Sequence, residues 1–145
     1  MVRQRPLQVP GSFNQSRRHY YRVFHESLNR GGRWYGPWWL LLAASVRKGI
    51  RINGEKTCQL NLRVSQLRML CARAGLPPWN TGSGLWLQDI DAEVCARVQA
   101  HLRADGIPCL SVHDTFIVPL SAHDRTRAVM DEEFARACAR LAERH

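Results

Sequence analysis

The stretch over residues 106–119 constrains the fold of this chain more than any other segment. It contains two short apolar runs, residues 109–112 and residues 116–118, with the polar pair His113-Asp114 between them. A proline stands near the outer end of each run, which is where β-strands tolerate proline. The pattern therefore predicts a β-hairpin with His113 and Asp114 at its turn.

The acid at this turn has two interpretations. Aspartate is a common turn residue because its short side chain can bond the local backbone, and Asp114 then needs no further role. A carboxylate at a hairpin tip is also open to solvent or to a cleft, where it can bind Mg²⁺, an ion that prefers hard oxygen ligands. The hairpin alone does not decide between a structural turn and a metal site.

Positive charge dominates the composition. The 145 residues include 21 Lys and Arg against 12 Asp and Glu, which gives a net charge of +9. Such an excess predicts an acidic partner, with nucleic acid the first candidate and an anionic membrane the second. The alternative is a basic protein that has no acidic partner. The length favours one domain or part of one.

The expected location is the cytoplasm, without a membrane partner. The N-terminal residues are basic and polar and lack the apolar core of a signal peptide. The longest apolar run, residues 38–46, is shorter than the ~20 residues that a membrane helix needs. The five cysteines form no Cys-x-x-Cys pair, so we expect reduced, buried thiols and no zinc site.

The first half of the chain predicts an arm followed by mixed elements. Residues 1–18 carry four arginines and two prolines and predict a flexible basic arm ahead of a domain over residues 19–145. Apolar spacing predicts short helices over residues 19–28 and 40–48. Asn53-Gly54 between two alternating runs predicts a second hairpin, whose outgoing strand continues into Leu62.

The second half predicts helices around the main hairpin. Apolar stripes predict a helix over residues 64–74, a long helix with its stripe from Leu87 to Leu102, and a final helix striped from Met130 to Leu141. The fold class is therefore α+β: a small antiparallel sheet with a central hairpin, residues 109–118, backed by helices.

The segment over residues 33–39 is rich in aromatic residues. Arg33 beside Trp34 can stack on bases and bind phosphate in a nucleic-acid-binding protein. The same aromatic cluster, which includes Trp38, can instead belong to the hydrophobic core and end at the Gly36-Pro37 turn. The sequence leaves both interpretations open.

Taken together, these segments resemble the palm domain of family A DNA polymerases and of single-subunit phage-type RNA polymerases. Residues 112–114, Val-His-Asp, resemble motif C, and residues 61–70 resemble motif A, with Leu67-Arg68 in register. Residues 80–85 resemble the Gly-Ser entry to the helix that precedes motif C. A narrower resemblance is to a group of uncharacterised bacterial polymerase-palm-like proteins, and it covers most of the chain from residue 29 onward.

The resemblance implies a catalytic site in which one of the two metal-binding carboxylates is replaced. Palm enzymes transfer nucleotides with two metal ions ~3.5–4 Å apart, held by one Asp of motif A and one of motif C. Asp114, beside His113, would be the motif C metal ligand, whereas Asn61 stands where motif A has its Asp. An amide carries no charge, so we expect weak or absent Mg²⁺ binding.

Two further differences from the palm enzymes concern the nucleotide. Only residues 76–81 separate the motif A helix from the next helix, so the fingers region, which binds the triphosphate, is missing. Arg63 stands where motif A has Ser and places a cation beside the expected metal site. The residues expected to contact nucleic acid are Arg33, Trp34, Arg63 and Arg68.

Three hypotheses about function follow. The chain is a catalytically impaired palm-like protein that binds DNA or RNA or is vestigial; or it is an active Mg²⁺-dependent polymerase; or it is a protein-interaction module, for example a homodimer covering the surface that the fingers once covered. All palm-based hypotheses require Asn61 and Asp114 to lie next to each other.

Overall fold

The computed structural model describes residues 18–25, 27–62 and 84–143. It contains both helices and antiparallel strands, so the predicted α+β class is confirmed. The first seventeen residues and the helix predicted over residues 64–74 lie outside the described residues. In chain order the elements are β1 (Tyr21–His25), β2 (Ser27–Tyr35), the 3-10 helix η1 (Trp38–Leu41), α1 (Ala44–Arg47), β3 (Arg51–Ile52), β4 (Glu55–Asn61), α3 (Gly84–Ala104), β5 (Leu110–Val112), β6 (Thr115–Pro119), the 3-10 helix η2 (Leu120–Ala122) and α4 (His123–Glu143).

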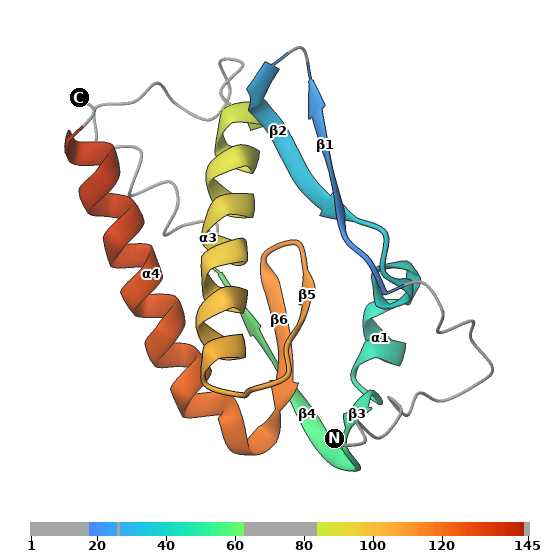
Figure 1. Ribbon diagram of the computed structural model, residues 1–145. Helices are drawn as coiled ribbons and strands as arrows, with labels where there is room; N and C mark the ends of the chain where they lie inside the picture. The colour runs from blue at the N-terminus through green and yellow to red at the C-terminus, as the bar shows by residue number, and fades with distance from the viewer. Residues whose placement is uncertain (1–17, 26, 63–83, 144–145) are drawn as a thin grey trace.

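The larger sheet contains four antiparallel strands in the order β3-β4-β6-β5. The predicted hairpin of residues 109–118 supplies β5 and β6, and of these two strands β6 is an inner strand and β5 an edge strand. Figure 1 shows the two long helices, α3 and α4, side by side next to this sheet, with α3 between α4 and the β1–β2 ribbon. In the described ranges, neither these helices nor the shorter ones combine the length and the apolar character that a bilayer crossing requires.

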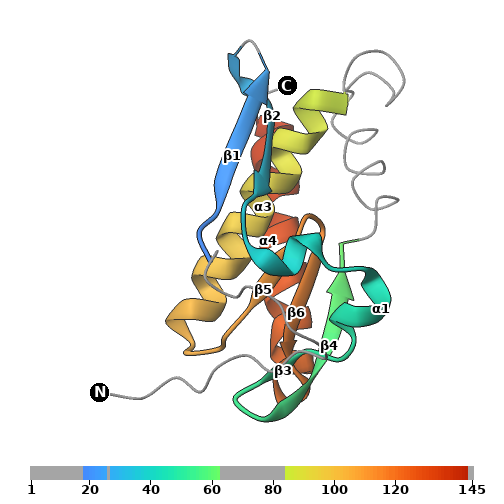
Figure 2. The same ribbon diagram turned by 90° about the vertical axis from the view of Figure 1, so that its right-hand side faces the viewer.

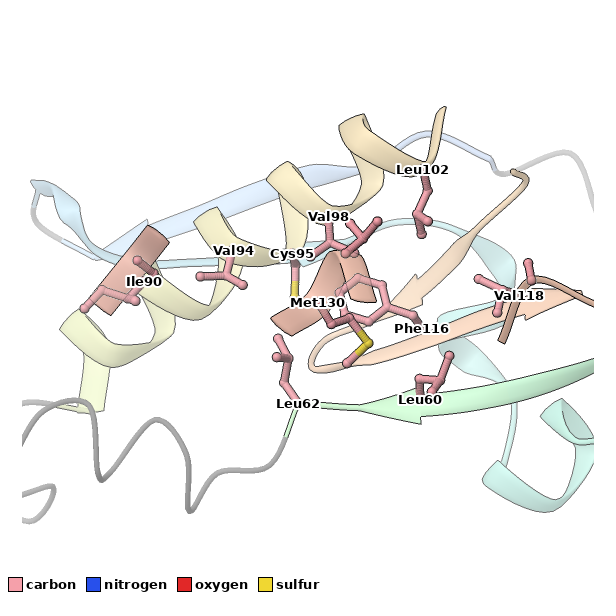
Figure 3. Packing of buried hydrophobic residues seen from close by; sticks show 13 residues of the cluster. Leu60, Leu62, Ile90, Val94, Cys95, Val98, Leu102, Phe116, Val118 and Met130 are labelled. Atoms are coloured by element: carbon pink, nitrogen blue, oxygen red, sulfur yellow. The ribbon is translucent and has the colours of Figure 1, made fainter. Parts of the chain in front are cut away.

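Alternation along β6 separates two cores, and β4 adds Leu60 to one of them. Leu60, Phe116 and Val118 pack with the apolar sides of α3 and α4, as Figure 3 shows. Ile117 points to the opposite face of the sheet, where it packs with Trp38 and the neighbouring aromatic and aliphatic residues. Because fully burying one such side chain contributes about 1.5–3 kcal/mol, these two cores fix the pairing of the strands.

The hairpin between β3 and β4 forms as predicted. Arg51 pairs with Lys56 and Ile52 with Glu55, so the turn consists of Asn53 and Gly54 alone. Both turn residues have positive φ angles, 53° and 81°. This is the conformation that favours Asn-Gly in two-residue hairpin loops.

The helix predicted over residues 19–28 is wrong, because this segment pairs with the next one as the β1–β2 ribbon. Tyr21 lies opposite Tyr35, and exposure alternates along β1, with Tyr21 and Val23 outward and Arg22 and Phe24 half-buried. Aromatic and β-branched residues favour this pleated arrangement, and the same residues also fit a helical spacing over so short a window.

Gly32 occupies a position in β2 that leaves no room for a side chain. Its φ angle is +78°, and a Cβ atom there would collide with the Arg22 guanidinium and lie 2.9 Å from the Phe24 ring. The register also shifts on either side of Phe24. Glycine is the residue that accepts both the backbone conformation and the close contact.

The helix predicted over residues 40–48 is shorter than expected. Leu42 and Ala43 are extended and separate η1 from α1. The break lets Leu42 join Trp38 and Trp39 in the second core, where all three are buried. Tertiary packing here overrides the helical propensity of a Leu- and Ala-rich run.

The outer edge of β5 is closed by side chains. The Tyr20 hydroxyl donates to the Ser111 carbonyl oxygen at 3.1 Å and accepts a hydrogen bond from the Ser111 N–H at 3.0 Å. The Trp39 indole N–H also reaches the Ser111 carbonyl oxygen at 3.1 Å. Burial raises the pKa of Tyr20, so the hydroxyl stays neutral and can both donate and accept.

Removing this hydroxyl should destabilise the protein. In Tyr20→Phe the Ser111 N–H would lose its partner inside the structure, at a cost of about 1–3 kcal/mol in the free energy of unfolding. The matched control is Tyr21→Phe, whose side chain is 54% exposed and whose hydroxyl can remain hydrated. Urea unfolding measures both variants. Equal free energies of unfolding for the two would show that Tyr20 does not hold the edge.

Candidate functional site

Asn61 and Asp114 lie next to each other at one end of the sheet, as predicted. Asn61 is the last residue of β4 and pairs with Thr115, the first residue of β6. The Leu62 N–H donates to the Asp114 carbonyl oxygen at 2.7 Å, which extends the pairing to the turn. The two residues that the palm resemblance singles out therefore occupy neighbouring positions.

Thr115 bridges the two side chains. Its hydroxyl donates to Asn61 Oδ1 at 2.6 Å and lies 3.4 Å from Asp114 Oδ1. The two distances together put the Oδ1 atoms at most about 6 Å apart. The shorter bond shows that Asn61 presents its carbonyl oxygen, rather than its NH₂ group, to this site.

His113 has a backbone conformation that residues other than glycine rarely adopt. It is the first of the two turn residues and has a φ angle of +54°, where hairpin turns prefer glycine. For a residue with a Cβ atom this conformation costs roughly 1–2 kcal/mol. The Cys95 thiol of α3 donates to the His113 carbonyl oxygen at 2.9 Å and holds the turn against the helix.

The thiols around this site are neutral. Burial raises the pKa of Cys95 well above its usual range, and the nearby Asp91 and Asp114 carboxylates raise it further. Burial likewise raises the pKa of Cys109 to about 12. Among the described cysteines, Cys58, Cys95, Cys109 and Cys138, none is in a disulfide. Such thiols serve as hydrogen-bond donors and packing groups rather than as nucleophiles.

The residues present do not fit a two-metal centre. Asp114 supplies one carboxylate, whereas Asn61 and Thr115 supply neutral oxygens that already bond each other. The described part of the chain contains no group of three or more His, Cys, Asp and Glu side chains that could hold a metal ion. Two Mg²⁺ ions need several anionic oxygens in near-octahedral geometry, so we derive no reaction step through a metal here.

Of the four predicted nucleic-acid residues, the structure describes Trp34 and the backbone of Arg33, both in β2. Trp34 is half-buried and fastens the ribbon to α3, with its indole N–H 3.1 Å from the Ala92 carbonyl oxygen and its ring 5.3 Å from the Arg22 guanidinium carbon. Arg33 lies in β2 opposite Val23. Arg63 and Arg68 lie outside the described residues. For Trp38 the core interpretation is confirmed, because only 3% of the residue is exposed.

Two surface features of the structure were not predicted from the sequence. Arg51 and Lys56 face each other across the β3–β4 hairpin, and the two-residue Asn-Gly turn would have revealed this pairing by counting outward from it. Tyr21 and Tyr35 stack across the β1–β2 ribbon, with ring centroids 6.1 Å apart. A helix over residues 19–28 does not bring these two rings together, so the sequence pattern carries no signal for the second pair.

Comparison with known proteins identifies no relative: no family model, curated protein or solved structure matches this chain.

The Cys95 thiol predicts a loss of stability at alkaline pH. Its pKa is raised in the folded protein, so above the ordinary value of 9.0 the unfolded chain loses this proton first and stability falls as pH rises. At pH 10 this effect amounts to about 1 kcal/mol. Cys95→Ser keeps a donor but does not titrate, so its free energy of unfolding should fall less between pH 7 and pH 10. The other thiols and Tyr20 are common to both proteins, and an identical fall in both would contradict the prediction.

Proposed function

We propose that this chain is a nucleic-acid-binding protein built on a truncated polymerase-palm-like core that is impaired in nucleotidyl transfer. The observation that carries the proposal is a group of exposed cations, Lys48, Arg51 and Lys56, at the β3–β4 end of the sheet. No carboxylate of the described residues pairs with any of the three. Phosphate groups of DNA or RNA are the chemistry that such a group fits.

The position of Arg51 and Lys56 is electrostatically unfavourable without a partner. The two residues are direct cross-strand neighbours, and like charges in this position destabilise a hairpin. The nearest acid in sequence, Glu55, is engaged elsewhere, because its carboxylate accepts the Ser121 N–H at 2.8 Å. Hydrogen bonding from Ser121 also lowers the pKa of Glu55, which keeps that carboxylate as an acceptor. A bound polyanion would relieve the repulsion between the two cations.

The resemblance to a polymerase palm supports the same proposal. A strand ending in Asn61, a later helix, and a hairpin with His113-Asp114 at its turn follow each other in the order of a palm, and the two site residues are neighbours. The uncharged Asn61 favours a binding role over catalysis, since only one of the two expected carboxylates remains. The active polymerase and the protein-interaction module stay as the alternatives.

Removing the two cross-strand cations, Arg51 and Lys56, should lower the affinity for DNA and make that affinity less dependent on salt. In Arg51→Gln/Lys56→Gln the slope of log affinity against log salt should fall by ~0.7 per lost contact on single strands and ~0.9 on duplex. Fluorescence anisotropy of labelled DNA between ~50 and ~200 mM salt measures the slope. The control is Arg97→Gln/Arg125→Gln, which removes the same charge from cations that already pair with Glu93 and Asp105. Absence of binding to single-stranded and duplex DNA at the lowest salt would overturn the proposed function.

Restoring the second carboxylate should restore a metal site. In Asn61→Asp, two acids within about 6 Å repel each other by roughly 1–3 kcal/mol, so the variant should be less stable than wild type in EDTA and recover in Mg²⁺. Thermal unfolding with and without Mg²⁺ measures this, and Asn61→Asp/Asp114→Asn should show neither effect. Wild type should show no Mg²⁺ shift and no template-directed incorporation above Asp114→Ala; incorporation above that level would favour the active polymerase instead.

A further inference from the structure

The two exposed tyrosines of the β1–β2 ribbon form an aromatic surface beside the candidate site. Tyr21 and Tyr35 are Cα partners, and their rings stack at 6.1 Å with an angle of 28° between the planes. They are 54% and 38% exposed, so both rings present surface to the solvent. Of the exposed large hydrophobic residues in the described chain, only Val23 lies beside them on the ribbon.

This surface is continuous with the turn that carries Asp114. The Tyr35 ring packs edge-on against the His113 ring, with centroids 5.9 Å apart at 74°. Figures 1 and 2 show the lower end of the ribbon, where β1 begins and β2 ends, close to the tip of the β5–β6 hairpin. A ligand on the tyrosines would therefore lie within reach of the Asn61–Thr115–Asp114 end of the sheet.

The opposite side of the ribbon holds the tyrosines in place. Trp34 bonds the Ala92 carbonyl oxygen of α3, and the Arg22 guanidinium lies over the Phe24 ring at 4.7 Å and donates to the Gly32 carbonyl oxygen at 2.7 Å. The ribbon is thus anchored through its inner face, while its outer face presents two rings that are already ordered. Ordering the side chains before binding lowers the entropic cost of stacking a ligand on them.

We infer that Tyr21 and Tyr35 are a stacking platform for an unpaired nucleobase of single-stranded nucleic acid. The inference rests on the proposed function and names the form of nucleic acid bound. The bases of a duplex already stack on each other, whereas an unpaired base exposes a π-face that aromatic side chains accept at ~1–3 kcal/mol per base. A protein partner fits less well, because the exposed large apolar side chains that the structure describes on this ribbon are Tyr21, Val23 and Tyr35, a small apolar centre for a stable interface of ~20–30 residues per side.

The platform can be tested with a single-stranded oligonucleotide that carries 2-aminopurine, and with the same oligonucleotide in a duplex. Binding of wild type should quench the single-strand fluorescence, because the stacked base is quenched by the tyrosine rings. Tyr21→Ala/Tyr35→Ala should abolish the quenching and weaken single-strand binding ~10-fold or more, with duplex affinity unchanged. Tyr21→Phe/Tyr35→Phe keeps both rings and should behave as wild type. Leu120→Ala, which trims another residue that is 54% exposed, is the surface control.

The outcomes separate this inference from the proposed function. If wild type binds DNA and the alanine variant binds and quenches equally, the platform is overturned and the proposed function stands. If the alanine variant loses single-strand and duplex binding equally, the preference for an unpaired base is overturned. If wild type binds neither form, both are overturned. Because loss of folding would mimic the expected result, circular dichroism must show that the alanine variant keeps the wild-type fold, and the phenylalanine variant tests the rings independently.

Discussion

The pairing of β4 with β6 is the constraint on which the rest of the structure depends. β6 buries Phe116 and Val118 in one core and Ile117 in the other, and β4 adds Leu60 to the first, so a shift of one residue would move Leu60 and Phe116 away from the helices and Ile117 toward them. That penalty fixes the register, and the register sets Asn61 opposite Thr115 and beside Asp114. The geometry of the candidate site is thus a consequence of apolar packing far from its polar atoms.

The single negative charge of Asp114 determines the chemistry of the end of the sheet where Asn61 and Thr115 also lie. A carboxylate, an amide and a hydroxyl form a small hydrogen-bonded group, and only Asp114 carries a negative charge among them. A group of exposed positive charges lies elsewhere, around the β3–β4 hairpin, where Arg51 and Lys56 have no acidic partner among the residues that the structure describes. Strands rise about 3.3 Å per residue, so the five residue steps from Lys56 to Asn61 separate these regions by roughly 17 Å. An extended polyanion could span that distance, whereas a mononucleotide could not.

Local signals in the sequence predicted the elements that depend on local chemistry. The Asn53-Gly54 turn, the stripe of α3 and the β5–β6 hairpin each carry their own pattern, and each forms. Periodicity alone does not say which distant segments of a chain pair with each other. The resemblance to a polymerase palm supplied that pairing and so predicted that Asn61 and Asp114 lie close together. The β1–β2 ribbon was missed because Tyr21 and Phe24 fit a helix as well as a strand, and the choice is made by packing on α3. The stacking of Tyr21 on Tyr35 depends on that pairing and was invisible for the same reason.

Tyr20 and Trp39 close the outer edge of β5 against pairing with a second copy of this chain. An unpaired strand edge can recruit a strand from another molecule and so begin aggregation. The Ser111 N–H and carbonyl oxygen, which would start such pairing, are already occupied by side chains from the N-terminal half. The other edge, β3, is only two residues long and bears Arg51, whose charge repels a second copy. The four-stranded sheet is therefore protected against growth from either side.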